Sequence, residues 1–423
     1  MAPQPILLVG SGGREHALAA KIRLDAPDTE LLVAPGNPGT AAVGRNVPVA
    51  ADDIAGLVGL ARSAGVGLTI VGPEAPLAAG IADAFAAEGL PLFGPSAAAA
   101  RIESSKAFAK TLMRDEGVPT AAFEVFRAPE PALARVRAGN PPFVVKASGL
   151  AGGKGAFVCP DRAKAERVIR ALMVERTLGN AADEILLEEY LEGEELSVFF
   201  LTDGETAVPL VPSRDHKRRF EKDEGPNTGG MGAFAPVPGA GPDLVDRIRR
   251  EVAEPVLAGL AARGCPYRGF LYAGLMLTAD GPRVIEFNCR LGDPEAQAVL
   301  PLTGGDLVEP VRTVASGARL SGWDPDPAPG AALVTVVVSG GYPGPVEKGV
   351  PIEVPAGLEG PDVRLYHAGT STAGGRLVTA GGRVFGVTGL GATLAEASER
   401  SRAAAARIRF EGADWRSDIG RVR

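Results

Sequence analysis

The chain has 423 residues, of which 45% are hydrophobic and 22% charged, a globular composition at a length typical of about two to four domains. Its net charge of -7, without a long basic run, argues against non-specific binding to nucleic acid. Three widely separated cysteines argue against a disulfide framework and a zinc site, and no apolar run approaches the ~20 residues that span a bilayer. We therefore expect a cytoplasmic protein with small-molecule partners, and neither nucleic acid nor membrane among them.

The N-terminal part predicts a parallel βαβ domain. An apolar strand at 5–10 precedes a glycine turn and a helical pattern, and residues 31–35 and 68–73 repeat the order of strand and turn. Residues 90–96 add a strand. A helix is expected at 104–117, ending at a glycine. We place the limits of this domain at 1–103.

The pattern then changes to paired strands. Residues 143–148 and 155–159 form one predicted pair, a helix follows at 161–175, and residues 184–191 and 195–204 form a second predicted pair, which together suggest a small α+β lid at about 122–194.

A larger unit follows the lid. It carries a predicted helix at 243–263 and a strand pair, 269–278 with 283–290, joined by a turn at 279–281. A proline-rich linker at 323–330 precedes strands and a helix at 394–408. We expect domains at 104–325 and 326–423, the latter a small α+β domain rich in strands.

The turn Gly10-Ser11-Gly12-Gly13 follows a strand and opens a helix, as in a dinucleotide-binding oxidoreductase. That fingerprint needs a third Gly or Ala, where Glu15 stands, and an acid after the second strand, where the chain reads Pro35-Gly36-Asn37. A nicotinamide site is therefore disfavoured. Free N–H groups at a helix start suit an anion, and Arg14 adds a cation, but a bare turn remains the alternative.

The loop 148–155 reads SGLAGGKG and lies between two predicted strands, so it is not a Walker loop, which opens a helix. Glycines let a backbone close over phosphate oxygens, and Lys154 would bring a positive charge to a transferring phosphoryl group. An ordinary hairpin turn is the alternative.

A segment with carboxylates at both ends follows. Glu188 and the backbone around Leu191 could meet the edge of an adenine, while Glu195 is spaced to reach ribose hydroxyls. An acidic surface hairpin would have the same sequence pattern.

Glu286 and Asn288 alternate on a predicted strand and therefore point to one face. Two oxygen ligands on one face suit magnesium, which usually keeps waters and bridges nucleotide phosphates. A strand with one polar face is the alternative.

These features occur together in a known superfamily. The chain resembles an ATP-grasp ligase, whose nucleotide lies between two α+β lobes. The resemblance is carried by Lys106 and Lys146, the glycine flap (residues 148–155), the acidic segment from Glu188 to Glu195, and the strand with Glu286 and Asn288. The chain also resembles the phosphoribosylamine-glycine ligase family in motifs along almost its whole length. Among these motifs are KASGLAGGKG, GPNTGGMGAF and VIEFNCRLGDPEAQ. Gly152 replaces a frequent Ala, residues 219–221 depart from the common link, and the strand LYAGLM offers no acid for a second metal.

The resemblance implies a multidomain α/β and α+β fold: an N-terminal parallel βαβ (pre-ATP-grasp) domain, a two-lobed ATP-grasp and a small β-rich C-terminal domain. It also implies ligation of glycine to 5-phosphoribosylamine through glycyl phosphate, giving glycinamide ribonucleotide, ADP and phosphate in purine biosynthesis. ATP with Mg²⁺ or Mn²⁺ is expected, in a monomer or weak dimer. Another ATP-grasp ligase or carboxylase of purine synthesis, or a non-catalytic nucleotide sensor, remains the alternative.

The resemblance further implies roles for individual residues. The nucleotide would be bound by Lys106, Lys146, Gly152, Gly153, Lys154, Glu188, Glu189, Leu191 and Glu195, and the metal by Glu286 and Asn288. The expected catalytic residues are Lys154, Arg290, Asp215, Asn227 and Asp293. The other substrates would be bound by Gly12, Gly13, Arg14, Gly36, Asn37, Gly229, Gly230 and Met231. No catalytic role is assigned to His16, His216 or His367.

Overall fold

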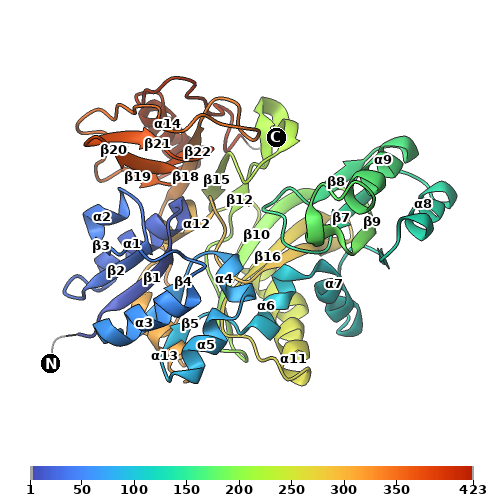
Figure 1. Ribbon diagram of the computed structural model, residues 1–423, viewed down its shortest axis with the longest axis horizontal. Coiled ribbons are helices and arrows are strands. Elements are labelled where there is room, and N and C mark those ends of the chain that lie inside the picture. The colour runs from blue at the N-terminus through green and yellow to red at the C-terminus, as the bar shows by residue number, and fades with distance from the viewer. Residues whose placement is uncertain (1–2, 422–423) are drawn as a thin grey trace.

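The computed structural model describes residues 3–421, and its N-terminal part is a parallel sheet covered by helices (Figure 1). The strand order is β3-β2-β1-β4-β5, so the predicted βαβ fold is confirmed. The strands are β1 (Ile6–Gly10), β2 (Leu31–Pro35), β3 (Arg45–Asn46), β4 (Leu68–Val71) and β5 (Leu92–Phe93). The helices are α1 (Gly13–Asp25), α2 (Thr40–Val43), α3 (Ile54–Ala64), α4 (Glu74–Ala78), α5 (Ile81–Ala87) and α6 (Ala97–Ser104).

The predicted helix after this sheet is α7 (Lys106–Asp115), and it leads into a separate lobe. The lobe is a four-stranded sheet in the order β6-β9-β7-β8, with a hydrophobic cluster of its own. Its elements are β6 (Phe123–Phe126), α8 (Pro129–Ala138), β7 (Phe143–Ala147), β8 (Ala156–Cys159), α9 (Arg162–Met173), η1 (Gly179–Ala182) and β9 (Ile185–Glu189). The predicted lid, with its glycine loop between β7 and β8, is present.

The second predicted strand pair of the lid is wrong. Strand β9 pairs with β6 and β7, whereas β10 (Glu194–Thr202) pairs with β11 (Ala207–Pro209) and β16 (Gly269–Thr278) in another sheet. Both strands are apolar, and their sequences do not say which sheet buries them. Residues 190–193 therefore connect two lobes instead of turning a hairpin.

The sheet of the second lobe has the order β11-β10-β16-β17, and β17 (Gly281–Asn288) pairs with β16 as predicted. The predicted helix at 243–263 is α10 (Pro242–Ile248), a π-helical turn η3 (Arg249–Ala253) and α11 (Glu254–Ala262). The elements that follow are α12 (Ala296–Val299), η4 (Leu300–Leu302) and α13 (Val308–Ala315).

The C-terminal sheet includes strands from the central part of the chain. Its order is β12-β15-β18-β22-β19, where β12 (Arg214–Asp215) and β15 (Gly232–Ala235) precede the proline-rich linker. The other strands are β18 (Ala331–Val338), β19 (Val363–His367) and β22 (Arg383–Gly391), against which α14 (Leu394–Ala405) packs. Two hairpins complete the chain: β13 (Arg218–Phe220), η2 (Glu221–Asp223) and β14 (Glu224–Asn227), and β20 (Thr370–Ala373) with β21 (Arg376–Thr379).

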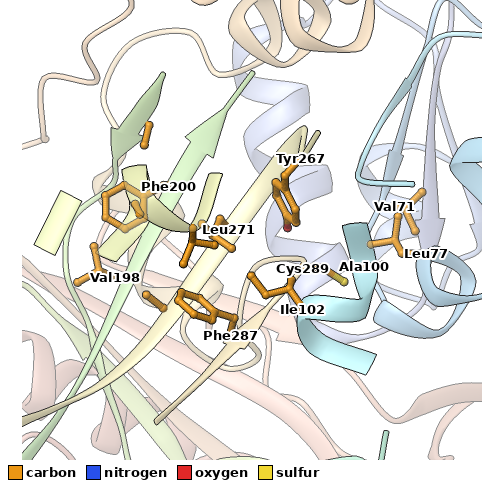
Figure 2. Packing of buried hydrophobic residues seen from close by; sticks show 14 of the residues in the cluster. Val71, Leu77, Ala100, Ile102, Val198, Phe200, Tyr267, Leu271, Phe287 and Cys289 are labelled. Atoms are coloured by element: carbon orange, nitrogen blue, oxygen red, sulfur yellow. The ribbon is translucent and has the colours of Figure 1, made fainter. Parts of the chain in front are cut away.

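A continuous hydrophobic core joins the N-terminal part to the second lobe (Figure 2). Leu77 and Ile102 from the N-terminal side belong to the same buried cluster as Leu271, Phe287 and Cys289 of the second lobe. Burying this apolar surface is the main force that holds the two parts in one orientation. No helix among residues 3–421 is long and apolar enough to cross a membrane.

Candidate active site

A cavity of about 950 Å³ lies where all parts of the chain meet. The lid, the second lobe, the N-terminal part and the C-terminal segment each contribute to its wall. Of the predicted residues, the wall includes Arg14, Lys106, Lys146, Gly152, Gly153, Glu188, Glu189, Leu191, Glu195, Asp215, Asn227, Gly229, Glu286, Asn288, Arg290 and Asp293. Its volume is at the upper end of the range for small-molecule sites.

A buried charge cluster lies in the part of the cavity next to residues 190–193, the hinge that connects the two lobes. Glu188, the penultimate residue of β9, accepts at Oε2 from Lys146 Nζ at 3.0 Å and from Lys110 Nζ at 2.9 Å. Its other oxygen, Oε1, is buried and has no hydrogen-bond partner among the described residues. Because a buried acceptor without a partner is costly, this oxygen fits a ligand that donates a hydrogen bond, such as the amino group of adenine.

Lys110 was not predicted from the sequence. Burial lowers the pKa of Lys110 to about 8, although the negative charge of Glu188 acts in the opposite direction. Lys110 lies one helical turn after Lys106 on α7, and this i, i+4 spacing on one helix face is the signal that could have identified it.

Carboxylates and cations alternate on the cavity wall formed by β10 and β12. Glu195 Oε2 accepts from Lys217 Nζ at 2.6 Å, and Asp215 Oδ1 lies 3.7 Å from the same nitrogen. Burial raises the pKa of Asp215 to about 7, with Lys217 opposing and Glu295 adding to the shift. Lys217, which no prediction included in the site, is therefore the cation shared by two predicted ligand-binding carboxylates.

The two predicted metal ligands line the cavity from β17. Burial alone would raise the pKa of Glu286, but Lys217, Lys106, Lys146 and Arg290 together lower it, so this carboxylate is ionised. The residue paired with Glu286 across the sheet is Gly274 of β16, the strand whose sequence LYAGLM offers no acid for a second metal.

One carboxylate and one amide oxygen fit a magnesium ion that takes its remaining ligands from phosphates and water. The surroundings of Asn288 direct its amide nitrogen to Glu103 Oε1 at 3.0 Å, which reserves its oxygen for another partner. Within residues 3–421 no group of three His, Cys, Asp or Glu side chains could hold a metal.

Arg290 is held by two acids that were not predicted. Its NH2 lies 2.8 Å from Glu103 Oε1 and its Nε lies 3.2 Å from Glu74 Oε2. Burial acts against the charged form of Arg290, but these two carboxylates raise its pKa above the ordinary value. Glu74 lies in the VGPEAP motif, and its spacing carries no signal of this long-range contact.

Residues of the C-terminal part reach the far end of the cavity. Arg383 of β22 lines it and donates from NH1 to the carbonyls of Asp293, at 2.6 Å, and of Gly229. Gly229 N donates to Tyr342 Oη at 3.0 Å. Arg383 and Tyr342 thus hold two predicted site loops from more than fifty residues away.

Two predicted residues of the glycine-rich loop 225–232, Gly230 and Met231, do not line the cavity. Met231 was expected to bind substrate, but its side chain is fully buried in the hydrophobic core and has no surface on the cavity. Gly230 has φ +111°, and a Cβ there would collide with the ring of Pro294. A glycine is therefore required at position 230, because the backbone there packs closely against Pro294.

Two N–H groups of the N-terminal turn, those of Gly12 and Arg14, already have protein partners. Gly12 N donates to Glu15 Oε2 at 2.6 Å, and Arg14 N donates to Asp293 Oδ2 at 3.4 Å. Gly12 and Gly13 lie outside the cavity wall, and a Cβ at Gly13 would meet the Gln297 amide. Arg14 alone reaches the cavity from this turn, with its Nε 2.6 Å from Glu15 Oε1.

Asn37 holds parts of the protein together and is not on the cavity wall. Its Nδ2 donates to Ser11 O at 2.8 Å and to His367 O at 2.9 Å, and its Oδ1 accepts from Gly39 N and Thr40 N. The neighbouring Gly36, at φ +71°, packs against Asn46. The Asn37 amide has no group left for a ligand, so its side chain has a structural role in place of the expected substrate contact.

Lys154 is exposed on the glycine flap, outside the cavity wall. Its Nζ lies 3.5 Å from Pro343 O, in the GGYPG loop of the C-terminal part. Its predicted action on the phosphoryl group therefore requires the flap to move.

All three histidines have structural partners. His16 Nδ1 accepts from His367 N at 2.8 Å, and the His367 ring contacts Thr370 Oγ1 at 3.0 Å. His216 Nε2 accepts from Gly420 N at 3.2 Å.

Two α+β lobes joined by a short hinge, with a glycine flap and buried lysines around a nucleotide-sized cavity, define an ATP-grasp protein. The models of the phosphoribosylglycinamide synthetase N domain, ATP-grasp (A) domain and C domain match residues 4–103, 104–296 and 332–422. The chain belongs to the phosphoribosylglycinamide synthetase family.

Individual relatives agree with this assignment. A phosphoribosylamine-glycine ligase of Allochromatium vinosum is 50% identical over 98% of this chain and 97% of that protein, and one of Vibrio vulnificus is 46% identical over the same shares. The crystal structure of the phosphoribosylamine-glycine ligase of Thermotoga maritima matches with a TM-score of 0.85 and 33% identity, covering 98% of this chain and 99% of that one. A biotin carboxylase domain from Hydrogenobacter thermophilus, 18% identical with a TM-score of 0.74 over 97% of this chain and 91% of that one, shares the fold.

Proposed function

We propose that this protein joins glycine to 5-phosphoribosylamine with ATP, giving glycinamide ribonucleotide, ADP and phosphate in purine biosynthesis. The observation that carries the proposal is one cavity whose wall includes Glu188, with its unpartnered Oε1, next to the hinge, and Arg14 and Arg383 from the N-terminal and C-terminal parts. Such a cavity accommodates a nucleotide and a second, anionic substrate together. Full-length relatives named phosphoribosylamine-glycine ligase support the same reaction.

The first step is a phosphoryl transfer. A carboxylate oxygen of glycine attacks the γ-phosphorus of ATP, the bond to the β,γ-bridging oxygen breaks, and ADP leaves. This chemistry depends on positioning and charge neutralisation. Lys106 and Lys146 would bind phosphate oxygens. Glu286 and Asn288 would hold Mg²⁺ or Mn²⁺, which supplies further charge neutralisation when bound.

The second step is acyl transfer to an amine. The nitrogen of phosphoribosylamine attacks the carbonyl carbon of glycyl phosphate, inorganic phosphate leaves, and the nitrogen loses one proton. Asp215 and Asp293 are the carboxylates available for the glycine ammonium, while Asn227 and Gly229 border the acyl group. Arg290 would bind carboxylate or phosphoryl oxygens. Arg14 would bind the phosphate of phosphoribosylamine.

We also propose domain limits of 1–103, 104–325 and 326–423, with the lid at about 122–194. The ranges of the three family models support them. Because β12 and β15 share a sheet with β18, the last two domains are not independent folding units.

The test is an assay of ADP release with ATP, glycine and phosphoribosylamine, from which one component is omitted at a time. We expect release only with all three. Glycine labelled with oxygen-18 in its carboxylate should transfer label to inorganic phosphate, because that oxygen bridges carbon and phosphorus in the intermediate. Formation of AMP and pyrophosphate, or label in AMP, would contradict the proposal.

A further inference from the structure

Lys110 is buried beside the cavity, and none of the roles assigned above uses it. Its side chain is 2% exposed, on the face of α7 that packs against β9. The ammonium is 2.9 Å from Glu188 Oε2 and donates to Thr120 Oγ1 at 2.8 Å. Thr120 in turn donates to Val284 O at 2.6 Å, so Lys110 is fixed to both lobes.

Two ammonium groups share a single carboxylate oxygen in this cluster. Lys146 Nζ also lies 3.0 Å from Glu188 Oε2, and it donates to Ile285 O at 3.0 Å. Two cations and one anion leave a net charge of +1. With both lysines on Oε2, the carboxylate cannot turn its other oxygen toward them without losing a short ion pair, and Oε1 stays without a partner.

We propose that Lys110 is a positioning residue for nucleotide-base selection: it anchors Glu188 through Oε2, so that Oε1 accepts a hydrogen bond from the amino group of adenine. This inference rests on the proposed use of ATP. Guanine presents a carbonyl at the corresponding edge, and two facing acceptors in a buried site would both be unpaired, which is costly. An anchored Glu188 therefore favours ATP over GTP.

Lys110 has a second effect on the nucleotide. Because Lys110 shares the negative charge of Glu188, Lys146 keeps more of its positive charge for a phosphate oxygen. When Lys110 is absent, Glu188 and Lys146 form a neutral pair, and the carboxylate can rotate to offer both oxygens to Lys146. Loss of Lys110 is thus expected to weaken ATP binding and to reduce discrimination between the bases.

The test measures the Kd of ATP and of GTP by calorimetry in the full-length protein, without glycine or phosphoribosylamine. For Lys110→Met we expect the ATP Kd to rise about tenfold and the ratio of GTP Kd to ATP Kd to fall about tenfold. The matched control is Arg114→Met, at an exposed position one turn further along α7, which should leave both values unchanged. Thr120→Val keeps the ion pair between Lys110 and Glu188 but removes the hydrogen bond from Lys110 to Thr120. It should lower the ratio of GTP Kd to ATP Kd by about threefold. This variant carries the test if Lys110→Met does not fold.

A double-mutant cycle separates positioning from general destabilisation. In a Glu188→Gln background, Lys110→Met should no longer change the ratio, because it acts through the carboxylate. An unchanged ratio in Lys110→Met with a lower melting temperature would overturn the proposal, as would an effect that persists in the Glu188→Gln background. Since these are binding measurements, failure of the proposed ligase reaction would appear separately, as absent ADP release in the wild-type protein.

Discussion

At the scale of single residues, Glu286 illustrates how the cavity keeps a buried carboxylate ionised. The side chain belongs to β17 and is surrounded by four cations that lower its pKa against the effect of burial. Removing the negative charge leaves those cations uncompensated and removes the predicted metal ligand. The consequence should fall on chemistry more than on folding, because β17 lies along the cavity wall.

We predict that Glu286→Gln lowers kcat by roughly 10² to 10³, the usual effect of losing one preorganised electrostatic contact at a transferring group. Steady-state ADP release measures this, with thermal unfolding in parallel. The matched control is Asp280→Asn in the exposed turn of the same hairpin, which should behave as wild type. Turnover of Glu286→Gln within about fivefold of wild type would exclude the proposed role.

Arg14 is the second residue whose role can be isolated. If it binds the phosphate of phosphoribosylamine, Arg14→Ala removes a charge-assisted contact of about 1.5 to 3 kcal/mol, which raises the KM of that substrate roughly 10- to 100-fold. The KM values of ATP and glycine should hardly change, since their proposed sites lie in the other domains.

The assay for Arg14→Ala should generate the unstable amine in the cuvette from ribose 5-phosphate and ammonia. Arg23→Ala is a suitable control, because Arg23 lies on the same helix but donates to the backbone carbonyls of Val43, Pro27 and Thr29. If all three KM values rise together, or none rises, the phosphate assignment is wrong.

At the scale of elements, helix α1 and strand β19 meet through two histidines, the buried His16 and the half-buried His367. Burial, and then the neighbouring His367, lower the pKa of His16 from 6.5 to about 3, while burial lowers that of His367 to about 4. Both rings therefore take up protons more readily in the unfolded chain. Their contribution to stability is complete above pH 6.5 and is lost as the pH falls toward 4.

We predict that the free energy of unfolding, from urea titrations, falls by roughly 1.4 kcal/mol for each of these histidines between pH 7.5 and 5.5. Asp215, whose pKa is raised to about 7, changes stability in the opposite direction over this range, so the informative quantity is the difference between variants. His16→Gln should reduce the pH dependence by about the contribution of one histidine. An unaltered pH dependence in this variant would show that His16 is not held neutral at the interface.

At the scale of the whole molecule, Arg416 in the C-terminal segment fastens the loop 215–223, which carries Asp215 and Lys217. Arg416 is 1% exposed, with its guanidinium 2.9 Å from Asp223 Oδ1 and 2.8 Å from Asp418 Oδ1. It also donates to Arg218 O at 2.9 Å. The C-terminal segment thus lies under one wall of the cavity, more than 190 residues away along the chain.

We predict that Arg416→Met lowers kcat/KM about tenfold or more and makes the 215–223 loop more sensitive to limited proteolysis. The reason is that a buried arginine with hydrogen-bond partners on this loop holds it in one conformation, and methionine keeps the volume without the hydrogen bonds. Arg407→Met, at an exposed position after α14, provides the control. Wild-type kinetics in Arg416→Met would show that the loop does not need this anchor.

The fold class and most of the elements were predictable because they depend on local periodicity. Alternation places Glu286 and Asn288 on one face of a strand, and continuous apolar runs between helices give a parallel sheet. Most predicted nucleotide-site residues line the cavity because their motifs lie at strand ends and turns, where side chains reach a shared edge.

What only the tertiary structure decided is which distant groups meet. Sequence patterns did not reveal that β9 and β10 belong to different sheets or that Lys110 shares Glu188 with Lys146. They also did not reveal that Glu15 and Asp293 accept from two N–H groups of the first turn. Nor did they place Arg383 and Arg416 at the cavity loops. Periodicity specifies the face on which a side chain lies, whereas its partner depends on how sheets from all parts of the chain bury their apolar faces against one another.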